Sequence, residues 1–227
     1  MINKNFLTNR ICEIASSVTK KVVCEIGADH GYITYQLFKQ KKIKFAYLTD
    51  ISNKSLQKAQ NLFEKSNLLK KVDFAVGDGL EAINKFSKTT LEVNPIQQIV
   101  IAGMGGKEII KILTKNNNYT QFVLQPQKNV VDLRNFLVKN NYKITKDKIV
   151  KDGKMFYDVI VAKKSNKATS ITKNQLLFGK TNLKLMHQDF VDYLHFKKEM
   201  LQNILQKKQV KDYQLIYKKI LKLLQNT

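Results

Sequence analysis

The sequence predicts an α/β protein with a mainly parallel sheet that ends in an antiparallel hairpin, followed by a helical C-terminal extension. Short apolar runs alternate with amphipathic helical segments five times between residues 21 and 140. Two further strand-like runs then flank the turn at Asp152-Gly153, and Asp-Gly between such runs is a strong hairpin signal. Beyond residue 173 the apolar residues recur in steps of three and four, as they do on helices.

The first half of the chain holds a leading helix and three strand–helix units. Leu7–Val18 is predicted to be a helix because Leu7, Ile11, Ile14, Ala15 and Val18 share one face. The valine-rich run before Gly27 predicts a buried parallel strand. Ser52 is predicted to be the N-cap of the third helix. The predicted elements are strand Lys21–Ile26, helix Gly31–Lys39, strand Phe45–Thr49, a helix from Ser52 to Glu64, strand Val72–Val76 and short helix Leu80–Phe86.

The second half completes the alternation and then changes it. The predicted elements are strand Gln98–Ala102, helix Lys107–Leu113, strand Phe122–Leu124, helix Val130–Asn140 and the hairpin strands Tyr142–Val150 and Met155–Ala162. Alternating units imply right-handed crossovers and a parallel sheet. Five such units followed by a hairpin make the seven-stranded, Rossmann-like sheet typical of class I methyltransferases. A dinucleotide dehydrogenase would usually add a sixth unit and a substrate domain.

The C-terminal region is predicted to be a helical hairpin with a coiled-coil-like seam. Lys163–Lys173 is polar and is interpreted as a linker, and a break is expected near Lys208–Lys211. The seam residues are Phe190, Leu194, Lys197, Leu201, Ile204, Tyr213, Ile216 or Tyr217, Ile220 and Leu223. The seam is short, so we expect it to fold back on itself or onto the core. The chain is therefore divided into a methyltransferase-type domain, 1–165, and a helical extension, 166–227.

Composition excludes several classes of protein. Apolar residues make up 43% of the 227 residues, which favours a packed core over disorder. The sequence has no apolar run of the roughly 20 residues that span a bilayer, and Met1–Arg10 lacks the pattern of a signal peptide. A cytoplasmic location is expected. Cys12 and Cys24 are expected to be buried thiols, and the spacing of Cys and His predicts no metal site.

The net charge of +22 is compatible with a polyanionic partner such as nucleic acid. The basic residues are nearly all lysines, and Arg10 and Arg134 are the only arginines. Abundant Lys, Asn and Ile together with the absence of Trp are also what an AT-rich coding sequence produces by drift. The charge alone is therefore weak support for a nucleic-acid partner.

The loop from Glu25 to Gly31 is the first candidate binding site, because its glycines permit tight turns and close approach of a ligand. Asp29 stands where a dinucleotide-binding loop has its middle glycine. A carboxylate would repel a pyrophosphate but suits the sulfonium and amino groups of S-adenosylmethionine (SAM). Glu25, Gly27, Asp29 and Gly31 are therefore candidate SAM ligands. The alternative is an ordinary strand-to-helix turn.

The ends of the next three strands supply the other cofactor candidates. Asp50 can accept hydrogen bonds from ribose hydroxyls. The alternative is a carboxylate at a helix N-terminus, where the helix dipole favours negative charge. The remaining candidates at these strand ends are Ile51, Asp78, Gly79, Gly103 and Met104. Each could also be a plain turn, but ligands of open α/β sheets bind across the carboxyl ends of the strands. In series, these strand ends predict one shared crevice.

These motifs together resemble one family, the bacterial tRNA (adenine-22-N1)-methyltransferases known as the TrmK family. The resemblance is carried by the first helix with Arg10 and by the segments Glu25–Tyr32, Gly77–Glu81, Ile101–Gly106, Leu124–Pro126, Asp152–Lys154 and Phe156–Val159. Gly31 and Glu25 depart slightly, since alanine and aspartate are common there in the family. The C-terminal sequence matches weakly.

The resemblance implies methyl transfer from SAM to N1 of an adenine in tRNA. It implies catalytic roles for Asp29, His30 and Tyr32 and substrate contacts for Arg10, Gly105, Gln125 and Pro126. Asp29 would serve the adenine, the methionine amino group, or both. Many enzymes that methylate exocyclic amino groups carry an Asn/Asp-Pro-Pro-Tyr motif after the fourth strand. None occurs here, which weighs against an amino group as the target.

Three other functions stay open on the sequence alone. They are methylation of a small molecule or another RNA, RNA binding without catalysis on a SAM-type fold, and NAD-dependent oxidoreduction, which Asp29 disfavours. The sequence does not give the oligomeric state, and a monomer is the default expectation.

Overall fold

The computed structural model describes residues 7–116, 118–208 and 210–225, and a seven-stranded sheet in the order β3-β2-β1-β4-β5-β7-β6 forms its centre. The strands are β1 (Val22–Ile26), β2 (Phe45–Asp50), β3 (Val72–Val76), β4 (Gln98–Met104), β5 (Gln121–Pro126), β6 (Tyr142–Asp152) and β7 (Met155–Lys164). Strands β1 to β5 are parallel, and β7 runs antiparallel to both β5 and β6. The predicted seven-stranded sheet with its terminal hairpin is confirmed.

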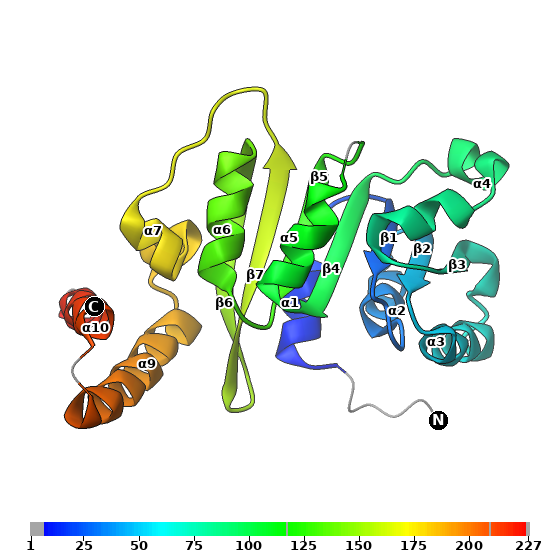
Figure 1. Cartoon of the computed structure of the whole chain (residues 1–227). Coiled ribbons are helices and arrows are strands. Elements are labelled where there is room, and N and C mark those ends of the chain that lie inside the picture. The colour runs from blue at the N-terminus through cyan, green and yellow to red at the C-terminus, as the bar shows by residue number, and fades with distance from the viewer. Residues whose placement is uncertain (1–6, 117, 209, 226–227) are drawn as a thin grey trace.

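Helices cover both faces of the sheet (Figure 1). One apolar cluster joins the sheet to α1 (Asn9–Ser17), α2 (Tyr32–Lys39) and α3 (Asn53–Lys65). A second joins the opposite face to η3 (Gly79–Lys85), α5 (Gly106–Thr114) and α6 (Val130–Lys139). Successive strand residues alternate between the two clusters, as Val23 and Cys24 do in β1. Burial on both faces explains why the strands are continuous apolar runs.

Several element boundaries differ from those predicted. The first helix begins at Asn9 because the Thr8 hydroxyl caps it, accepting from the backbone N–H of Ile11 at 3.4 Å. Leu7 therefore lies outside the helix and is 48% exposed rather than buried. The predicted helix after β3 is a 3₁₀ helix, η3, and the short segments η2 (Leu69–Lys71) and α4 (Lys88–Val93) were not predicted. Residues 1–6 lie outside the described residues.

The C-terminal helices gather at one side of the molecule, beyond β6 (Figure 1). They are α7 (Lys173–Phe178), α8 (Lys180–Leu185), α9 (Gln188–Lys207) and α10 (Lys211–Leu224). The predicted seam is buried at Phe190, Leu194, Leu201 and Ile220, which form a small core with Ile149 of β6. The helices thus pack both on each other and on the sheet, and the break falls where it was predicted. Helices α7 and α8 were not predicted, and the division at residue 165 stays a prediction.

A buried ion cluster lies where the extension meets the sheet. Arg134 of α6 donates from Nε and Nη2 to the two carboxylate oxygens of Asp147, both at 2.8 Å. Its Nη2 also donates to Asp158 at 2.6 Å, and its Nη1 donates to the carbonyl oxygen of Leu176 in α7 at 3.1 Å. The cluster therefore fastens α7 to α6, β6 and β7. No helix within the described ranges is long and apolar enough to cross a membrane.

Candidate active site

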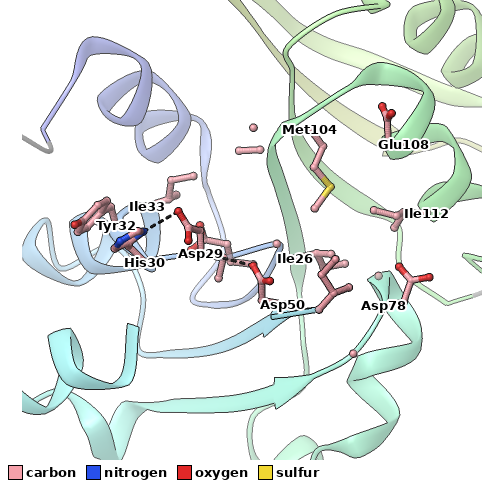
Figure 2. Close-up of a pocket in the computed structure, with 18 of the residues that line it drawn as sticks. Ile26, Asp29, His30, Tyr32, Ile33, Asp50, Asp78, Met104, Glu108 and Ile112 are labelled. Carbon is pink, nitrogen blue, oxygen red and sulfur yellow. Dashed lines mark hydrogen bonds and ion pairs between the residues drawn. The ribbon is translucent and has the colours of Figure 1, made fainter. Parts of the chain in front are cut away.

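A cavity of about 540 Å³ opens at the carboxyl ends of β1 to β4, the position at which open α/β sheets bind ligands. Its volume lies within the roughly 300–1,000 Å³ of small-molecule sites. Twelve predicted residues line it: Arg10, Glu25, Gly27, Asp29, His30, Tyr32, Asp50, Ile51, Asp78, Gly79, Gly103 and Met104. Figure 2 shows Asp29 and His30 on one side of it, and Met104 and Ile112 on the other.

The loop between β1 and α2 takes an unusual backbone path along this cavity. Gly27, Asp29 and Gly31 all have positive φ angles, of 69°, 48° and 70°, and aspartate tolerates this left-handed region better than most residues. Gly31 does not line the cavity. A Cβ there would lie 2.9 Å from side-chain atoms of both Leu48 and Phe63, so glycine at 31 serves close packing beneath the loop.

Glu25 lines the cavity but directs its carboxylate to the start of α2. Its Oε2 accepts from the Thr34 backbone N–H at 3.1 Å and from the Thr34 hydroxyl at 2.6 Å. Glu25 is only 3% exposed, and this burial raises its pKa to about 7, with the nearby carboxylates of Asp29 and Asp50 adding to the rise. Glu25 therefore caps α2 from the preceding strand and fixes the loop between them.

Asp50, at the end of β2, holds two loops at once. Its Oδ2 accepts from the backbone N–H of Asp29 at 3.0 Å, and its Oδ1 accepts from that of Ser52 at 2.8 Å. Each carboxylate oxygen can accept a further hydrogen bond. Asp50 therefore keeps acceptor capacity for a ligand in the cavity.

Asp29, His30 and Tyr32 form one group at the cavity wall. His30 Nδ1 and Asp29 Oδ2 are 2.7 Å apart, and the rings of His30 and Tyr32 stack with centroids 5.2 Å apart and planes at 16°. The Asp29 side chain is 63% exposed, so its carboxylate is accessible. The group offers an anionic side chain beside two flat rings, which is suited to a flat substrate that becomes cationic.

The opposite wall comes from the ends of β3 and β4 and from α5. Asp78 and Gly79 lead into η3. The Met104 side chain lies against the loop after β1, so closely that a Cβ on Gly27 would be 2.1 Å from Met104 Cε. Glu108, Lys111 and Ile112 of α5 and Ile33 of α2 also line the cavity and were not predicted. For Glu108 and Ile33, the available signal was their position in the first turns of helices that follow glycine loops. Lys111 and Ile112 lie about one turn further along α5, where no such signal exists.

Three predicted substrate residues do not line the cavity: Gly105, Gln125 and Pro126. Gln125 is fully buried, and its Oε1 accepts from Arg10 Nη1 at 3.0 Å and from the backbone N–H of Gly103 at 3.2 Å. Gln125 therefore lies outside the cavity and holds Arg10 and Gly103, which line it, through these hydrogen bonds. Among the described residues, no cluster of three His, Cys, Asp or Glu could hold a metal ion.

Comparison with known proteins gives a consistent result. Residues 23–226 match the model of the family TrmK, tRNA (adenine(22)-N(1))-methyltransferase. A Mycoplasma genitalium protein named as a candidate tRNA methyltransferase is 33% identical over 170 residues, which cover 74% of each chain. The Bacillus subtilis tRNA (adenine(22)-N(1))-methyltransferase is 30% identical over 166 residues, covering 71% of this chain and 66% of that one.

A solved structure agrees along nearly the whole length. A Streptococcus pneumoniae protein, a candidate tRNA (m1A22) methyltransferase in complex with S-adenosyl-L-methionine, superposes with a TM-score of 0.81 at 26% identity, covering 99% of this chain and 100% of that one. The family match extends through the C-terminal helices as well as the sheet. The chain belongs to the TrmK family of tRNA (adenine(22)-N(1))-methyltransferases.

Proposed function

We propose that this protein transfers a methyl group from SAM to N1 of adenine 22 in tRNA, within the cavity at the ends of β1 to β4. The observation that carries the proposal is the convergence of Asp29, Asp50 and Asp78 on this one cavity in a chain of the TrmK family. The protein is then a SAM-dependent enzyme with tRNA as its partner. A cytoplasmic location and a monomeric state stay predictions.

The donor groups of the cavity fit SAM. Asp50 has acceptor capacity left for the ribose hydroxyls, and Ile51, 75% exposed, offers an apolar surface for the adenine ring beside Asp78 and Gly79. The left-handed turn at Gly103 leaves room for the methionine part, because a Cβ there would meet only Arg10 Nη1, at 4.0 Å. Bound there, SAM supplies an electrophilic methyl group.

The substrate side needs positioning more than proton transfer. N1 of neutral adenine carries no proton, so its lone pair attacks without a general base, and alignment with the methyl carbon supplies much of the rate. Asp29 offsets the positive charge that develops on the adenine, and its hydrogen bond to His30 holds it in place. His30 and Tyr32 provide the flat surface on which the base lies. Because N1 is on the Watson–Crick edge, the adenine must be unpaired or extruded.

The test is methylation of unmodified tRNA with labelled SAM, followed by mass-spectrometric mapping of the modified base. We expect one N1-methyladenine at position 22 and no incorporation into tRNA that carries guanine there. Incorporation at N6, or only into small molecules, would refute the proposal.

A further inference from the structure

The two arginines of this lysine-rich chain have opposite environments. Arg134 is buried and pairs with Asp147 and Asp158. Arg10 lines the cavity, is only half-buried, and forms no ion pair with any described residue. An arginine whose charge is left unpaired at a ligand cavity is available to an anionic group of the ligand.

Two other residues fix the position of Arg10. The buried amide of Gln125 accepts from Arg10 Nη1 at 3.0 Å, and the guanidinium carbon lies 5.3 Å from the centroid of the Tyr157 ring, in the range of a cation–π contact. The other N–H groups of the guanidinium donate no hydrogen bond to any described residue. Tyr157 does not line the cavity, so any effect it has on a ligand acts through Arg10.

The same amide also connects Arg10 to the carboxyl end of β4. The oxygen of Gln125 that holds Arg10 accepts from the backbone N–H of Gly103, and a Cβ on Gly103 would lie 4.0 Å from Arg10 Nη1. Arg10 therefore lies beside Gly103, near the carboxyl end of β4. Besides Arg10, Lys111 is the other Lys or Arg among the lining residues, and it belongs to α5.

We infer that Arg10 is a preformed binding position for a carboxylate or phosphate group at the β4 side of the cavity, and that Tyr157 and Gln125 are positioning residues that aim it. A planar guanidinium matches either group with two parallel hydrogen bonds, which a lysine cannot reproduce. The inference rests on the proposed function, which supplies two sources of such an anion: the carboxylate of SAM and a phosphate of the tRNA backbone.

The first experiment tests the carboxylate. Wild type, Arg10→Gln and Arg10→Lys are titrated with SAM and with decarboxylated SAM, which keeps the sulfonium and amino groups. If Arg10 binds the carboxylate, wild type prefers SAM, and Arg10→Gln loses about tenfold or more in SAM affinity with little change for the decarboxylated compound. Arg10→Lys keeps the charge but cannot make the two parallel hydrogen bonds, so its affinity for SAM should lie between those of wild type and Arg10→Gln. Lys70→Gln, which removes an exposed charge at the other end of the sheet, is the control.

The second experiment tests the phosphate. Binding of unmodified tRNA is measured over a range of salt concentrations for the same variants. Loss of one phosphate contact lowers the affinity and reduces the slope of log K against log salt by about one, while the SAM affinity of Arg10→Gln stays at the wild-type value. Lys70→Gln should leave the slope unchanged.

The positioning role has its own readout. Tyr157→Phe keeps the aromatic face and should bind as wild type does, whereas Tyr157→Leu should reproduce part of the Arg10→Gln loss for the same ligand, with kcat at saturation nearly unchanged. Wild-type affinities for SAM, decarboxylated SAM and tRNA in folded Arg10→Gln would overturn the inference. Equal binding by Tyr157→Leu and wild type would show that Tyr157 does not position Arg10. Failure of the wild type itself to methylate adenine 22 would instead refute the proposed function.

Discussion

The backbone N–H of Asp29 donates a hydrogen bond of 3.0 Å to Oδ2 of Asp50, which joins the loop after β1 to the end of β2. Asp50 therefore has two functions, because it shapes the loop that carries Asp29 and it faces the cavity itself. A substitution at Asp50 should weaken the cofactor site in two ways at once.

Asp50→Ala should lower the affinity for S-adenosylhomocysteine by about tenfold to a hundredfold, because bonds to a charged acceptor are each worth roughly 1.5–3 kcal/mol. Asp50→Asn keeps one oxygen acceptor and should lose less. Calorimetric titration measures both, with Asp132→Asn, an exposed carboxylate of α6, as the control. Equal affinities in Asp50→Ala and wild type would show that the ribose does not bind at β2.

Asp29→Asn isolates the charge of Asp29 from its backbone conformation. Asparagine tolerates the left-handed conformation that residue 29 adopts at φ 48°, whereas alanine would add strain. If the carboxylate offsets the charge on the adenine, kcat should fall roughly tenfold or more. Single-turnover methylation at saturating SAM and tRNA measures this step. A loss confined to the KM for SAM would instead assign Asp29 to the methionine amino group.

Much of the fold, and twelve of the residues that line the cavity, could be predicted from the sequence because they depend on local signals. Apolar alternation and the Asp152-Gly153 turn predict the sheet and its hairpin, and acidic or glycine residues at strand ends predict the cavity. Gln125 shows what such signals miss. Its position at the end of β5 resembles that of a ligand-binding residue, but its amide turns into the protein and bonds Arg10, 115 positions away.

The same limit applies to Glu25 and α5. A carboxylate at the end of β1 is predicted to bind a ligand, but the Glu25 carboxylate accepts two hydrogen bonds from Thr34 in the next helix. Glu108 and Ile112 of α5 also line the cavity. The position of α5 depends on its packing in the apolar cluster that it shares with the sheet and α6, and periodicity does not encode such packing between distant segments.

Glu25 should make the protein less stable as the pH rises. Its pKa in the folded protein is about 7, above the ordinary value of 4.5, chiefly because it is buried. Between these two values the folded state holds a proton that the unfolded state has released, so the free energy of unfolding falls as pH rises and levels off above about 7. The full difference is roughly 3 kcal/mol.

Glu25→Gln should remove this dependence, since the amide oxygen still accepts from Thr34 and carries no charge. Urea denaturation of both proteins at pH 5 and pH 8 measures it, and the variant should gain stability relative to wild type at pH 8 but not at pH 5. The same difference between the two proteins at both pH values would show that Glu25 does not titrate in this range.

Arg134→Leu should destabilise the protein by about 3–5 kcal/mol, because it leaves the buried carboxylate of Asp147 and the partly buried carboxylate of Asp158 without their partner. It also removes the hydrogen bond to the Leu176 carbonyl, so hydrogen exchange should rise first in α7 and the neighbouring part of β6. Urea denaturation measures the total, and the double variant Arg134→Leu/Asp147→Leu should recover part of the loss by removing one unpaired charge. SAM affinity should stay near wild type in conditions where the variant is folded, because the cluster lies outside the cavity. A loss of less than 1 kcal/mol would mean that the ion cluster does not hold the extension to the sheet.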